Sequence, residues 1–129
     1  MDAPQIEVTV ATVKAGDSAY VVTVGGELDL CSAPRLTAEL EALVADAPEI
    51  VLDLGGVTFA DSTAIGAILA AARRLADCGG RLSLVVPAGS TRKLIGLVGV
   101  DRMLPVYETA DRALEHLVGS VVLRKLEGE

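Results

Sequence analysis

Apolar and polar residues alternate near the start of the chain, which is the pattern of a half-buried β-strand. Residues 6–13 show this alternation, and a turn centred on Gly16 and Asp17 separates them from a second apolar run at 20–26. The second run ends in two glycines, which we expect to stop the strand. The pattern therefore predicts a β-hairpin at the start of the fold.

Apolar residues spaced three and four positions apart predict helices further along the chain. The first helix follows Ser32, which is placed to be its N-cap, and ends before Pro48. The second helix opens at Asp61 and is stopped by Gly79 and Gly80, since glycine adopts the left-handed conformation that ends helices. Its apolar stripe consists of Ile65, Ile68, Leu69, Ala72, Leu75 and Ala76.

Two more helices are predicted in the second half of the chain. Ser90 and Thr91 are placed to cap a short helix, and Thr109 is placed to cap the last one. The apolar positions of the short helix are Leu94, Ile95, Leu97 and Val98. Those of the last helix are Ala110, Ala113, Leu114, Leu117 and Val118.

Apolar runs between these helices predict three further strands. They cover residues 50–54, residues 81–87 and the positions around Val106 and Tyr107. The resulting order is β-β-α-β-α-β-α-β-α. Strands that alternate with helices favour parallel pairing, while the opening hairpin adds an antiparallel pair. The sequence therefore predicts an α/β fold in which a mixed, mostly parallel β-sheet is covered by about four helices.

Length and composition fit one globular domain. The chain has 129 residues, of which 51% are hydrophobic and 2% aromatic, so the core must be aliphatic. We expect the domain to span residues 1–118, with 119–129 as a helix extension or a tail. No apolar run reaches the roughly 20 residues of a membrane-spanning helix, and the start of the chain lacks the pattern of a signal peptide. A cytoplasmic protein that does not enter the membrane is therefore expected.

Charge and cysteine content narrow the possible partners. Eleven basic against eighteen acidic residues give a net charge of −7, which disfavours nucleic acid and anionic membrane surfaces as partners. Cys31 and Cys78 form no CxxC pair and no cluster with His116, so the sequence suggests no metal site.

The most informative stretch is residues 51–80, which reads as a strand, a loop and a helix. The N-terminus of this helix carries one acidic and two hydroxyl residues, which are Asp61, Ser62 and Thr63. From local sequence alone, Asp61 or Ser62 is interpreted as an N-cap that contributes roughly 1 kcal/mol. A helix N-terminus also presents free N–H groups and about half a positive charge, so it can hold an added phosphate without unfolding. The two roles can coexist on one serine.

Three segments in register resemble the STAS family, the sulfate transporter and anti-sigma factor antagonist domains. They are "GELDL" at 26–30, "LDLGGVTFADSTAIG" at 52–66 and "GVDRMLPVYETADRAL" at 99–114. The resemblance covers roughly residues 6–118 and implies the STAS fold. The middle segment is similar to the family's phosphorylation loop, except that Ala64 stands where glycine is usual. Alanine favours the helical conformation and is expected to stiffen the loop.

The resemblance implies an anti-sigma factor antagonist of the bacterial sporulation and stress-response type, and not an enzyme. Such a protein binds an anti-sigma factor of the GHKL serine kinase type. This binding frees the sigma factor that the anti-sigma factor had held. The kinase phosphorylates the serine that corresponds to Ser62, which ends the binding, and a PP2C-type phosphatase resets the protein. No cofactor is implied beyond the kinase's own ATP and magnesium.

The resemblance also implies which residues surround the switch. The loop that carries Asp29 is expected beside the phosphorylation loop, where Asp29 helps to orient the serine. Asp61, Thr63 and Ala64 complete the partner-binding loop. Thr63 is a secondary phosphate acceptor in this reading.

Two other functions remain open at this point. One is a STAS-domain scaffold in a stress-signalling assembly. The other is a nucleotide-binding STAS protein with weak hydrolase activity, although the chain has no GxxxxGK[ST] loop and no evident base to activate water. Some members of the family carry a second phosphorylated threonine near the position of Thr91, where a helix cap is the better interpretation. The sequence does not identify the anti-sigma factor, the sigma factor, the stimulus or the oligomeric state.

Overall fold

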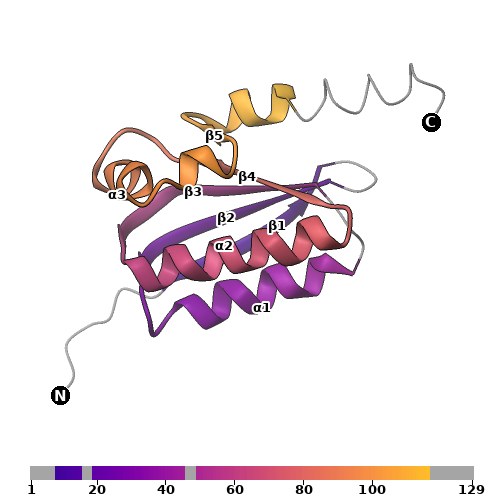
Figure 1. Cartoon of the computed structure of the whole chain (residues 1–129), viewed down its shortest axis with the longest axis horizontal. Coiled ribbons are helices and arrows are strands. Elements are labelled where there is room, and N and C mark those ends of the chain that lie inside the picture. The colour runs from indigo at the N-terminus through magenta and orange to yellow at the C-terminus, as the bar shows by residue number, and fades with distance from the viewer. Residues whose placement is uncertain (1–7, 16–18, 46–48, 117–129) are drawn as a thin grey trace.

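The computed structural model describes residues 8–15, 19–45 and 49–116 and contains one five-stranded sheet (Figure 1). Its elements are β1 (Thr9–Lys14), β2 (Ala19–Leu28), α1 (Ala33–Val44), β3 (Glu49–Ala60), α2 (Ser62–Asp77), β4 (Arg81–Val85), α3 (Ser90–Val98), a 3-10 turn at Val100–Arg102 and β5 (Val106–Tyr107). Residues 110–116 form the described part of a last helix.

The strands follow the order β1-β2-β3-β4-β5 across the sheet. β1 and β2 are antiparallel, whereas β2, β3, β4 and β5 are mutually parallel. This arrangement confirms the predicted α/β fold with a mixed, mostly parallel sheet. The predicted hairpin is also present, since the backbone N–H of Ala15 donates to the carbonyl oxygen of Ala19 at 2.7 Å. Gly16 and Asp17, which were expected at its turn, lie outside the described residues.

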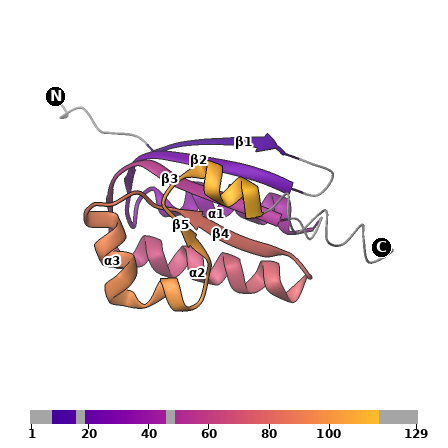
Figure 2. The same cartoon turned by 90° about the horizontal axis from the view of Figure 1, so that it is seen from above.

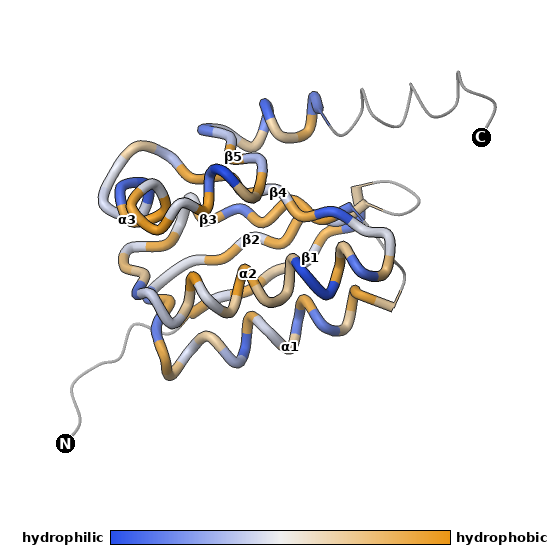
Figure 3. Tube along the Cα trace, in the orientation of Figure 1, coloured by the Kyte–Doolittle hydropathy of each residue, from blue (hydrophilic) through white to orange (hydrophobic). Residues whose placement is uncertain are grey.

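Helices cover both faces of the sheet unequally. α1 and α2 lie side by side on one face, and the helix at 110–116 crosses the other face (Figures 1 and 2). Hydrophobic residues run along the central strands and recur along α1 and α2 (Figure 3). The main core lies between the sheet and these two helices and includes Ile65, Ile68 and Leu75 of the predicted stripe. A smaller core on the opposite face consists of Ala19, Val51, Val85 and Ala113.

Two strands are longer than the sequence pattern predicted. β2 continues through Gly25 and Gly26 to Leu28, and β3 continues past two further glycines to Ala60, so the expectation that glycines stop the strand was wrong. Gly25 pairs with Gly56, and a Cβ on Gly56 would lie 3.2 Å from the Cα of Gly25. The glycines therefore allow the two strands to approach closely. Gly26, with φ of 91°, lies at a register shift in the same pair of strands.

The N-termini of the predicted helices were only partly correct. Thr109 caps the last helix as predicted, because its Oγ1 accepts from the backbone N–H of Arg112 at 3.3 Å. The N-cap of α3 is Gly89, so Ser90 and Thr91 lie inside the helix and do not cap it.

The apolar positions of α3 were also wrong in part. Ile95 is buried, but the side chain of Leu97 is 86% exposed and that of Val98 is 47% exposed. Leu117, Val118 and the predicted tail at 119–129 lie outside the described residues.

Candidate functional site

The N-terminus of α2 presents two hydroxyls on a capped helix. Asp61 is the N-cap, with an extended backbone at φ −108° and ψ 175°, and its Oδ1 accepts from the backbone N–H of Ala64 at 2.9 Å. Ser62 and Thr63 are the first residues of the helix, and both are exposed. Because Asp61 caps the helix, the Ser62 hydroxyl is not needed as a cap. This hydroxyl makes no hydrogen bond within the described part of the chain.

Ala64, which stands where the family usually has glycine, is buried at the start of α2. Its side chain is 1% exposed and belongs to the main core, while its N–H is held by Asp61. The methyl group therefore packs the first turn of α2 into the main core, while the expected stiffening of the loop stays a prediction. The exposed hydroxyls of Ser62 and Thr63 sit on this turn.

Asp29 organises the neighbouring loop, between β2 and α1. Its Oδ1 accepts from the backbone N–H groups of Cys31 at 2.9 Å and Ser32 at 3.0 Å. The Ser32 hydroxyl donates to the carbonyl oxygen of Glu27 at 2.7 Å and accepts from the N–H of Asp29 at 2.9 Å. Ser32 is the N-cap residue of α1 as predicted, but its side chain stabilises the loop and makes no capping hydrogen bond to the helix.

The two loops lie side by side, as the resemblance implied. Leu28 pairs with Ala60 at the ends of β2 and β3, and the backbone N–H of Asp61 donates to the carbonyl oxygen of Leu28 at 3.2 Å. No hydrogen bond among the described residues joins Asp29 to Ser62, because the Asp29 carboxylate is engaged in its own loop. The structure shows that Asp29 forms the loop beside Ser62, and its expected help in orienting the serine stays a prediction.

Two exposed apolar side chains flank this pair of loops, and sequence reasoning missed both. Leu30 is 66% exposed and follows Leu28 by two residues, while Phe59 is 51% exposed and precedes Asp61 by two. Phe59 lies opposite Glu27 in the β2–β3 register. The available signal was an apolar residue in a stretch interpreted as a loop, where nothing buries it. Exposed apolar side chains in these two neighbouring segments are available for contact with another protein.

The electrostatics of the site combine an acidic rim with a helix N-terminus. Asp29 and Asp61 belong to the two adjacent loops, and the free N–H groups at the start of α2 carry about half a positive charge. Arg74, the basic residue in the last turn of α2, pairs with Glu41 of α1, far along the helix from Ser62. The helix end therefore offsets part of an added negative charge on Ser62, while the two aspartates add to it.

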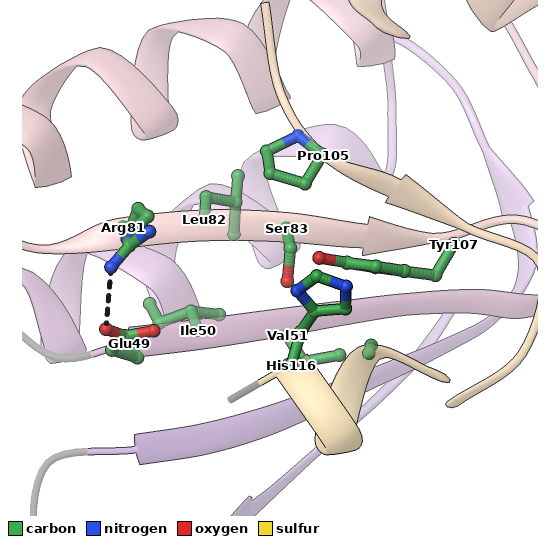
Figure 4. Close-up of a pocket in the computed structure, with 10 residues that line it drawn as sticks. Glu49, Ile50, Val51, Arg81, Leu82, Ser83, Pro105, Tyr107 and His116 are labelled. Atoms are coloured by element: carbon green, nitrogen blue, oxygen red, sulfur yellow. Dashed lines mark hydrogen bonds and ion pairs between the residues drawn. The ribbon is translucent and has the colours of Figure 1, made fainter. Parts of the chain in front are cut away.

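A hollow on the other side of the sheet lies near the last helix (Figure 4). His116 packs against Tyr107 there, with ring centroids 5.1 Å apart, and Arg81 pairs with Glu49 across its floor. Its free volume of about 50 Å³ is far below the roughly 300–1,000 Å³ of typical ligand pockets.

A broader, shallow depression of about 580 Å³ lies beyond the same two rings, lined by Arg92, Arg112, Glu108 and Glu115 among others. The charged residues of its lining are two arginines and two glutamates. Among the described residues, no group of three or more His, Cys, Asp or Glu side chains is arranged to hold a metal ion. Within the same residues, no helix is long and apolar enough to cross a membrane.

Comparisons with known proteins agree with this geometry. The profile of the family described as "Mlab, STAS domain" matches residues 11–105. The anti-sigma-F factor antagonist RsfB of Mycobacterium tuberculosis (strain ATCC 25618 / H37Rv) is 31% identical over 126 residues, which cover 96% of this chain and 100% of that protein.

Solved structures show the same fold. The crystal structure of an anti-sigma factor antagonist from Mycobacterium paratuberculosis matches with a TM-score of 0.78 at 34% identity, covering 90% of this chain and 97% of that one. The Bacillus cell fate determinant SpoIIAA, in its phosphorylated form, matches with a TM-score of 0.67 at 21% identity over 84% of this chain and 99% of its own. The protein therefore belongs to the STAS domain family and is related to the anti-sigma factor antagonists.

Proposed function

We propose that this chain is an anti-sigma factor antagonist that binds an anti-sigma factor, frees a sigma factor, and is switched off by phosphorylation of Ser62. The partner is an anti-sigma factor of the GHKL serine kinase type, and a PP2C-type phosphatase restores the binding form. The observation that carries the proposal is an exposed Ser62 hydroxyl, free of hydrogen bonds within the described residues, on a helix turn that Asp61 and Ala64 hold in place.

The proposed reaction transfers one phosphoryl group. The Ser62 Oγ forms a bond to the γ-phosphorus of the kinase-bound ATP, and the bond from that phosphorus to the bridging oxygen breaks as ADP leaves with its electron pair. The serine proton passes to a base that the kinase supplies. This chain contributes the positioned nucleophile, and the kinase contributes ATP, magnesium and the catalytic groups.

The effect of the phosphate follows from where it is added. Phosphorylation brings about −1.5 to −2 charge at neutral pH. The N-terminus of α2 offsets part of this inside the domain, so the fold should persist. A partner that fits the exposed surface of Leu30, Phe59 and the two hydroxyls would meet a bulky dianion beside Asp61. Binding should therefore be lost while the domain stays folded.

The comparisons support this proposal at the level of family. RsfB of Mycobacterium tuberculosis, which matches along nearly the whole chain, is an anti-sigma-F factor antagonist. SpoIIAA, which shares the fold, has been solved in phosphorylated and unphosphorylated forms.

The test begins with the identification of the kinase. Wild-type protein is used as bait, and a captured GHKL-type kinase is then purified and incubated with ATP and, in separate reactions, the wild type and two variants. We expect phosphopeptide mapping to place phosphate on Ser62 in the wild type and in Ser90→Ala, and to find none in Ser62→Ala. Ser90 is a matched control because it is also an exposed serine at the first position of a helix. Phosphate on Thr63 or elsewhere in the wild type, with Ser62 unmodified, would refute the assignment.

A further inference from the structure

The edge strand β1 has an open side. β1 is the outermost strand of the sheet within the described part of the chain, and it pairs with β2 in a regular register without a shift. The N–H of Ala15 donates to the carbonyl oxygen of Ala19, so the odd-numbered residues of β1 direct their backbone groups toward β2. The backbone N–H and C=O groups of Val10, Thr12 and Lys14 therefore point away from the sheet. Such a row of groups is a template for another strand.

The side chains of β1 divide between the two faces of the sheet. Val10 packs against the main core, and the Thr12 hydroxyl donates to Glu39 Oε2 of α1 at 3.1 Å, so even-numbered residues lie on the α1 face. The odd-numbered residues lie on the opposite face, where Val13 is 63% exposed. The strand contains no acidic residue, in a chain whose net charge is −7.

We infer that β1 is a self-association surface and that two copies of this chain pair antiparallel through it, with the two-fold axis at Thr12. In that register Thr12 faces its own counterpart, and Val10 faces Lys14 of the second copy. The outward backbone groups of all three residues then find partners. Centring the axis on Lys14 would place two lysines opposite each other, which is unfavourable.

Side chains on both faces support this register. Ala11 of one copy and Val13 of the other form a non-hydrogen-bonded pair, in which cross-strand side chains come closest. The exposed Val13 therefore gains an apolar neighbour. On the other face, Lys14 of the second copy lies next to Thr12, where Glu39 is already hydrogen-bonded. Lys14 of each copy is therefore complementary in charge to Glu39 of the other, and the two-fold axis produces this pair twice. This charge complementarity favours a second copy over an unrelated extended segment.

The proposed dimer leaves the Ser62 site free. β2 lies between β1 and β3, and Ser62 begins the helix that follows β3, so two exposed Ser62 sites would be carried by one dimer. An interface made of one strand pair is small, so association in the micromolar range or weaker is expected. This inference does not depend on the phosphorylation of Ser62.

The test uses sedimentation equilibrium from micromolar to millimolar protein at physiological salt. We expect the wild type to approach twice its 13.3 kDa mass as concentration rises. Thr12→Pro should weaken the association at least about tenfold, because proline removes an N–H that points away from β2 and is tolerated on the open side of an edge strand. Thr12→Val is the matched control, since it loses the Glu39 hydrogen bond but keeps the N–H, and it should still dimerise.

A charge exchange tests the same register independently of proline. Lys14→Glu should weaken the dimer several-fold, and the double variant Lys14→Glu with Glu39→Lys should restore it. Circular dichroism confirms that each variant is folded. A wild type that stays monomeric up to millimolar concentration would overturn the inference. So would a dimer that neither Thr12→Pro nor Lys14→Glu weakens.

Discussion

The backbone N–H of Asp61 donates a hydrogen bond to the carbonyl oxygen of Leu28 at 3.2 Å, which joins the loop before α2 to the end of β2. Asp61 also accepts from Ala64 through its side chain, so one residue links the start of the helix to the neighbouring strand. The exposed Ser62, which follows Asp61 as the first residue of α2, is therefore held in place by a backbone that is bonded to the end of β2.

Removing the cap at Asp61 should destabilise the domain measurably. Asp61→Ala loses the acceptor for the Ala64 N–H, at a cost of about 1 kcal/mol. In a domain of this size such a loss lowers Tm by about 4 °C. Asp61→Asn is the control, because asparagine caps helices about as well as aspartate. Thermal unfolding in which Asn and Ala cost the same would contradict the assigned cap.

Two substitutions of Asp29 separate the effect of its acceptor oxygen from that of its negative charge. Asp29→Ala should loosen its loop, because the N–H groups of Cys31 and Ser32 lose their shared acceptor. Asp29→Asn keeps an acceptor oxygen and should keep the loop. Amide hydrogen exchange at Cys31 and Ser32 should be faster in the Ala variant and close to wild type in the Asn variant. Fast exchange in both variants would show that the negative charge, and not the acceptor, holds the loop.

The glycine pairing between β2 and β3 predicts opposite effects at two glycines. Gly56→Ala places a Cβ 3.2 Å from the Cα of Gly25 and 3.3 Å from the carbonyl oxygen of Val24, which should destabilise by about 1–3 kcal/mol. Gly66→Ala is the matched control, since Gly66 is exposed on α2 and an added Cβ would meet nothing within 4 Å apart from its own stretch of the helix. It should stabilise by about 0.5–1 kcal/mol. Chemical denaturation measures both, and a neutral Gly56→Ala would contradict the close approach of the strands.

The same glycines show where sequence reasoning reached its limit. Apolar periodicity is a local signal, and it correctly predicted the hairpin, α1, α2 and the parallel strands. A glycine in a strand often marks a bulge or the close approach of another chain segment, and the segment that approaches Gly25, at Gly56, lies far along the sequence. Without its partner, the pair of glycines at 25–26 resembles a turn.

The site was predictable in position and less so in contacts. The motif at Asp61, Ser62 and Thr63 marked the start of α2, and the resemblance placed the Asp29 loop beside it. The hydrogen bonds that Asp29 makes to the backbone of Cys31 and Ser32 depend on loop geometry that no spacing encodes, so the sequence did not predict them. Leu30 and Phe59 escaped notice because an apolar residue is counted toward the core until its exposure is known.

The affinity of the purified kinase for this protein, measured with and without phosphate on Ser62, tests the proposed phosphorylation switch. Isothermal titration calorimetry is carried out with ADP-bound kinase, so that no further phosphoryl transfer occurs during the measurement. We predict that Ser62 phosphorylation raises Kd about 100-fold or more, since a loss of a few kcal/mol corresponds to that factor, while Tm changes by only a few degrees. Equal affinity of the kinase for the two forms, with both folded, would contradict a switch at Ser62.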